Sequence, residues 1–118
     1  MITELLTLKE QIKMYHWQTK SHSQHMALDR IYGDMQDSID EFVEIFIGKQ
    51  GRFDPENNIG ISLNTDIKNL NDFVEKNITY LSTDLIKNLD TQKDADLLNI
   101  AADMLGHINQ LKYLLTLS

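Results

Sequence analysis

The chain has 118 residues, of which 42% are hydrophobic, which is enough for one domain around a single core. It contains no cysteine, and this excludes disulfides, thiolate metal sites and iron–sulfur clusters. The formal net charge is −7 and the 11 basic residues are scattered, so neither DNA nor RNA is an expected partner.

The first half of the sequence predicts two helices joined by a short turn. Few glycines and a single proline favour an all-α protein. Residues 3–20 form the first predicted helix, residues 21–23 the turn with Ser23 as N-cap, and residues 24–49 the second helix, ended by Gly48 and Gly51. Apolar residues recur at helical spacing in both, giving the stripes Leu5, Leu8, Ile12, Tyr15 and Leu28, Ile31, Met35, Ile39, Phe42, Phe46.

The second half predicts two more helices after a long connection. Residues 51–64 contain the only proline and two glycines, so they form this connection. A third helix is predicted over residues 65–89, capped by Asn64 or Thr65, and a fourth over residues 94–117 after a short turn. Short turns make each pair antiparallel, and the long connection can cross over between the pairs. We therefore predict one domain over residues 1–118, a four-helix bundle.

Residues 16–44 contain the clearest candidate site. A helix turns 100° per residue, so Asp29, Asp40 and Glu44 project about 40°, 60° and 100° from the direction of His25. These four side chains therefore share one strip of the second helix, beside its apolar stripe. His16 lies just before the turn, from where it can reach His25. Histidine and carboxylate side chains together are typical metal ligands.

Distance divides these residues into two half-sites. His25 and Asp40 lie about 22 Å apart along a straight helix, whereas ligands sit ~2 Å from their ion. One chain cannot place both on one metal, but two second helices meeting antiparallel would join histidines of one chain to Asp40 and Glu44 of the other. The twofold axis would then pass near Gly33, which lets two backbones approach closely. We expect a homodimer centred there.

A mixed histidine and carboxylate shell favours iron(II), with zinc, manganese or cobalt as competitors. Calcium and magnesium prefer oxygen ligands alone. Iron with open coordination positions can pass electrons to oxygen or peroxide, so the site is suited to ferroxidase chemistry. The pair Asp103 and His107, one turn apart near the C-terminus, also has chelating spacing, but a hydrogen-bonded or exposed pair is the favoured interpretation.

The same residues resemble a known family. His16-Trp17 followed by a lysine, then His25-x-x-x-Asp29-x-x-Tyr32, then Asp40-x-x-x-Glu44, is similar to the signature of the Dps-like miniferritins. The resemblance implies a ferritin-like four-helix bundle that assembles into a dodecameric cage, oxidises iron(II) with peroxide and stores the product. It implies that His16, His25 and Asp29 of one subunit and Asp40 and Glu44 of its partner bind the iron, with Trp17 beside the site.

The sequence also departs from the family's pattern. The interval from His16 to His25 is shorter, so His22 in the turn is an alternative ligand. The chain starts at the first helix without a lysine-rich segment, and residues 51–64 are shorter than usual, so DNA binding is not expected and iron chemistry is expected more than the cage. The alternative function is a helical interaction protein, metal-free or metal-buffering, without turnover. No apolar run could span a membrane, and a cytoplasmic location is expected.

Overall fold

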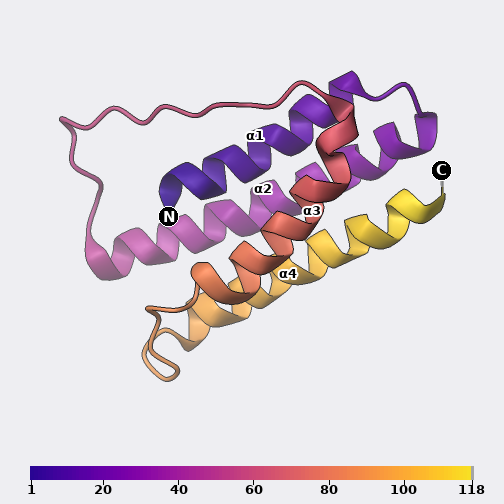
Figure 1. Cartoon of the computed structure of the whole chain (residues 1–118). Coiled ribbons are helices and arrows are strands. Elements are labelled where there is room, and N and C mark those ends of the chain that lie inside the picture. The colour runs from indigo at the N-terminus through magenta and orange to yellow at the C-terminus, as the bar shows by residue number, and fades with distance from the viewer. Residues whose placement is uncertain (118) are drawn as a thin grey trace.

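Four α-helices pack around one core in the computed structural model, which describes residues 1–117 (Figure 1). They are α1 (Ile2–Gln18), α2 (His22–Gln50), α3 (Leu70–Thr79) and α4 (Ala95–Leu114). Short 3₁₀ segments precede α3 (η1, Ile67–Asn69) and follow α4 (η3, Leu115–Leu117), and a π-helical segment continues α3 (η2, Tyr80–Asp84). Residues 1–117 contain no strand. The prediction of an all-helical fold with four helices is therefore confirmed.

α1 and α2 form an antiparallel hairpin whose predicted apolar stripes face the core. α1 packs along α2, and α2 packs in turn along α4. Phe46 is only half-buried and stacks near Phe53, with ring centroids 6.5 Å apart. The remaining stripe residues are at most 3% exposed: Leu5, Leu8, Ile12, Tyr15, Leu28, Ile31, Met35, Ile39 and Phe42. Helical spacing alone thus predicted this part of the core.

Both ends of α2 differ from the predicted ones. Ser21, not Ser23, is the N-cap, and its hydroxyl accepts a hydrogen bond from the Gln24 backbone N–H. Both serines suit the position chemically, so sequence could not choose between them. Gly48 lies inside the helix, and only Gly51 ends it, with φ 90° and its N–H donating to the Ile47 carbonyl.

The connection from residue 51 to 66 runs back along α1 in extended form, as Figure 1 shows. Gln11 holds its end: the buried side-chain amide donates to the Asn64 carbonyl and accepts from the Asn64 N–H, both at 2.7 Å. Gln18 similarly donates to the Thr65 carbonyl. The connection therefore crosses over as predicted, so that α3 starts near the end of α1.

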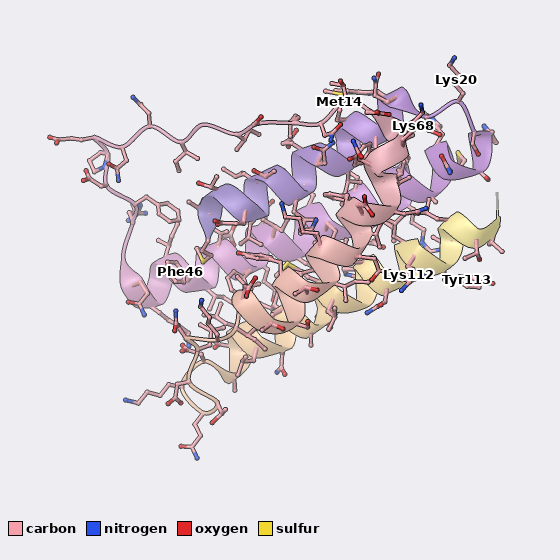
Figure 2. All side chains as sticks on the ribbon, in the orientation of Figure 1. Met14, Lys20, Phe46, Lys68, Lys112 and Tyr113 are labelled. Atoms are coloured by element: carbon pink, nitrogen blue, oxygen red, sulfur yellow. The ribbon has the colours of Figure 1, made fainter. Side chains whose placement is uncertain are left out.

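The predicted helix over residues 65–89 is not continuous. Its cap is neither Asn64 nor Thr65: the Asp66 carboxylate accepts from the Lys68 N–H and begins η1. After Thr79 the hydrogen-bond pattern changes, and the Leu85 N–H donates to the Tyr80 carbonyl, five residues back. Irregular turns follow from Leu85 to Leu89. An ion pair between Lys112 and Glu75 at 2.6 Å ties α3 to α4. Figure 2 labels Lys112 on α4.

Lys49 joins the C-terminal end of α2 to the turn before α4. Its ammonium lies 2.8 Å from Asp96 and 3.4 Å from Asp94, and it donates to the Lys93 carbonyl. The hydrogen bond that Lys49 donates to the Asp96 carboxylate raises the pKa of Lys49 and lowers the pKa of Asp96. Asp94 is the residue before α4 rather than its first residue. None of the helices in residues 1–117 is both long and apolar enough to cross a membrane.

Candidate metal centre

The turn between α1 and α2 is held by its own side chains. The Thr19 hydroxyl accepts from the Ser21 N–H and donates to the Gln24 side chain at 2.7 Å, and Ser21 caps α2. Thr19 and Ser21 both adopt extended backbone conformations, so the chain reverses within three residues. This tight reversal places the last turn of α1 directly beside the first turn of α2.

His16 and His25 are brought face to face by this reversal. Their rings stack with centroids 3.9 Å apart and planes inclined by 22°. The Nδ1 of His16 lies 3.0 Å from the His25 carbonyl oxygen, and the Nδ1 of His25 lies 3.1 Å from the His16 carbonyl oxygen. The shortened turn therefore does not separate the two histidines.

These reciprocal bonds fix how each imidazole is protonated. A carbonyl oxygen can only accept, so both Nδ1 atoms carry hydrogen, and in the neutral ring Nε2 keeps its lone pair. Histidine ligands are commonly oriented by such a bond from the nitrogen that does not bind the metal. The two Nε2 atoms are thus the ones available to a metal ion.

His22 and Trp17 flank the histidine pair. His22 is exposed on the first turn of α2, with its ring centroid 6.4 Å from that of His25. Trp17 is 64% exposed, and the Lys13 ammonium lies 5.9 Å from its ring centroid and 4.6 Å from that of Tyr32. Trp17 therefore lies at the surface beside the pair instead of packing in the core.

The three predicted carboxylates lie on the outer surface of α2. Asp29, Asp40 and Glu44 are exposed, and within residues 1–117 none has a hydrogen bond or an ion pair. Gly33 is exposed as well, and a Cβ added there would meet nothing within 4 Å. The strip thus has an open, unobstructed centre with acids on both sides.

No group of three or more His, Asp or Glu side chains within residues 1–117 is arranged to hold a metal ion. A single chain brings together His16 and His25, whereas Asp40 and Glu44 are fifteen or more positions further along α2. Any site using all of these residues must therefore include a second chain, as the helix length already required.

His107 makes a contact that sequence reasoning missed. Its Nε2 lies 3.3 Å from the Ser38 hydroxyl, which joins α4 to α2. Asp103 is exposed one turn earlier, so the two residues do not form a hydrogen-bonded pair. No sequence spacing signals a contact between residues 69 positions apart.

The fold and this site define a class: a four-helix protein with oriented, paired imidazoles on a helix hairpin. Residues 16–115 match the family described as "Family of unknown function (DUF5856)". The match begins at His16 and spans most of the chain, so the protein belongs to this family. No curated protein and no solved structure matches it.

Proposed function

We propose that this protein is a Dps-like ferroxidase of ferritin-like fold, which oxidises iron(II) at sites shared between two antiparallel α2 helices. The observation that carries the proposal is the stacked pair of His16 and His25, with both Nδ1 atoms bonded to carbonyl oxygens. This geometry leaves both Nε2 atoms free of the carbonyl bonds, on rings whose centroids are 3.9 Å apart, and two such nitrogens could form half of a metal site. A single long crossover between the second and third helices, typical of ferritin-like bundles, also supports it.

Asp40 and Glu44 of a partner subunit would supply the other half. Carboxylates without partners on an exposed helix face have ligand positions to offer, and Asp29 lies one turn from His25. If the histidine end of one α2 packs against the acidic end of the other, the twofold axis passes near Gly33, where the surface is open. Two nitrogens with several carboxylate oxygens suit iron(II) as the substrate, with zinc or manganese as competing ions.

The chemistry needs only electron transfer between iron and peroxide. Two iron(II) ions each lose one electron, and one hydrogen peroxide takes both electrons and two protons to become two waters. The residues of this chain hold the ions and neutralise their charge, while exposed acids draw cations to the surface. The iron(III) product is then sequestered by the homo-oligomer, which protects against peroxide.

Anaerobic addition of iron(II) to the purified protein, followed by peroxide, tests the proposal. We expect a rapid iron(III) absorbance that His25→Ala and Glu44→Ala each abolish, whereas Asp103→Ala, an exposed acid on α4, leaves it unchanged. Iron binding without oxidation would indicate a metal-buffering protein, and no binding a metal-free interaction protein.

Mixing the two inactive variants tests the sharing of the site. With random subunit exchange half of the dimers are mixed, and each mixed dimer has one intact site of two, so about a quarter of the activity should return. No recovery despite demonstrated exchange would contradict the two-chain site.

A further inference from the structure

A groove lies between α1 on one side and α3 with the π-helical segment η2 on the other. Its volume is about 910 Å³, and residues 62–64 of the connection form part of its lining. Small-molecule sites commonly measure ~300–1,000 Å³. None of the candidate iron ligands lines it.

Phe73 and Tyr80, both half-buried, form the accessible apolar part of this groove, whereas Tyr15 and Leu8, which also border it, are each only 1% exposed. Tyr15 and Phe73 meet edge to face, with centroids 5.4 Å apart and planes at 67°. Tyr80 stands opposite α1 on η2 and is half-buried. Tyr80 begins the π-helical turn, where the Leu85 N–H bonds to its carbonyl. Such turns are rare and frequently occur at functional sites.

Acidic side chains surround these rings. Glu4, Asp72 and Asp84 line the groove against one cation, Lys76. Glu4 is paired with the N-terminal amino group, but Asp72 and Asp84 have no hydrogen bond or ion pair within residues 1–117. Burial, together with Glu4 and Asp84, raises the pKa of Tyr80 to about 12, and burial with Asp66 and Asp72 raises that of Tyr15. Both phenols therefore stay neutral in a negative environment.

We propose that this groove binds an organic cation, an ammonium group carried on an apolar body. Aromatic faces attract a cation through their quadrupoles, and free carboxylates add to this attraction. The apolar body is accommodated by the accessible parts of Phe73 and Tyr80, which a bare metal ion could not use. An anionic ligand is disfavoured, because the carboxylates of Asp72 and Asp84, unpaired within residues 1–117, outnumber the ammonium of Lys76, while Glu4 is neutralised by the N-terminal amino group. The proposal is independent of iron chemistry on α2.

An NMR titration of the full chain with benzyltrimethylammonium tests this site. We expect amide shifts concentrated at Tyr15, Phe73 and Tyr80, with saturation. Benzenesulfonate and benzyl alcohol, of similar size but negative and neutral, should bind at least about tenfold more weakly. Equal binding of the three probes, no binding of the ammonium, or shifts located elsewhere would overturn the proposal.

Variants identify the groups responsible. Asp72→Asn and Asp84→Asn, both at exposed positions that should not disturb folding, are each expected to weaken ammonium binding severalfold. Tyr80→Leu should weaken it roughly 2- to 30-fold. The control Asp103→Asn removes an equivalent charge outside the groove and should leave affinity unchanged. If Asp103→Asn weakens binding as much as Asp72→Asn, only net charge matters and the site is refuted. Thermal unfolding of each variant verifies its fold.

Discussion

Gln11 is a polar side chain in an apolar surrounding, only 4% exposed on the inner face of α1. Its amide exchanges two hydrogen bonds with the backbone of Asn64, in the way a neighbouring strand would. A buried amide costs free energy unless both its donor and its acceptor are satisfied. Gln11 therefore anchors the connection at Asn64, because the loss of this contact would leave a buried amide unpaired.

Replacing Gln11 by alanine should lower the free energy of unfolding by about 2–3 kcal/mol. Two hydrogen bonds are lost, and the Asn64 backbone groups lose their partner. Gln18→Ala, which removes one bond from an exposed side chain to Thr65, is the matched control and should cost less than about 1 kcal/mol. Urea unfolding of both variants measures the difference. Equal destabilisation would show that Gln11 does not hold the connection.

At the residue scale, sequence predicted that His16 can reach His25 but not how. The tight turn and the helical spacing bring the rings together, and this much is local information. The reciprocal bonds use backbone carbonyls, which every residue possesses, so no residue pattern signals them. Ser21 and Ser23 are chemically equivalent as caps, so the residue pattern does not distinguish them either. Whether these histidines bind iron stays a prediction.

At the element scale, α1, α2 and α4 were predicted within a few residues, and the third helix was not. The long helices have clear apolar stripes that outweigh local preferences. Residues 79–84 instead include Thr79, Ser82 and Thr83, and Thr79 and Ser82 bond to backbone carbonyls and compete with regular helix. Leu81 and Leu85 are nonetheless buried, so the π-helical turn keeps both directed at the core.

The contacts of Lys49 with the turn before α4 predict how stability depends on pH. Because the pKa of Asp96 is lowered in the folded protein, this carboxylate contributes to stability. The contribution is complete above the ordinary pKa of 3.8 and disappears as pH falls below it. Hydrogen bonds from the backbone N–H groups of Lys93 and Gln92 likewise lower the pKa of Asp90. The pKa of Lys49 is instead raised in the folded protein. Its contribution to stability is therefore complete below pH 10.5 and is lost only as pH rises above that value.

We therefore expect Lys49→Met to reduce the fall in unfolding temperature between pH 7 and pH 3, because Asp96 has lost the partner that lowers its pKa. Lys87→Met is the matched control, since Lys87 is exposed and has no ion pair within residues 1–117. Thermal unfolding at both pH values measures the change. An acid-induced decrease identical in Lys49→Met and wild type would contradict the assignment.

At the scale of the whole molecule, the outer face of α2 has a pattern of residues that core packing does not require. The helices bury their apolar stripes, yet α2 presents Asp29, Gly33, Asp40 and Glu44 to the outside. The crossover topology was predictable from connection lengths, because short turns enforce antiparallel neighbours. The homodimer centred near Gly33 stays a prediction, since an interface depends on surfaces of two molecules and a single chain shows only half of it.

A substitution at Gly33 can distinguish an α2 helix that faces only solvent from one that packs against the α2 helix of a second chain. Gly33 and Gly106 are both exposed inside helices, and an added Cβ would meet nothing within 4 Å at either position. Alanine at each should therefore stabilise the monomer by up to about 1 kcal/mol. In the proposed dimer, however, only Gly33 lies at the axis, so Gly33→Ala places two methyl groups in the interface.

The two substitutions should consequently differ in self-association. Overpacking at an interface costs ~1–3 kcal/mol, so Gly33→Ala should weaken the dimer about five- to 150-fold while Gly106→Ala leaves it unchanged. Sedimentation over a range of concentrations measures this, and ferroxidase activity should fall in parallel with the dimer fraction. If both variants associate like the wild type, the two α2 helices do not cross at Gly33, and the histidines and acids of the strip cannot form a shared site in that arrangement.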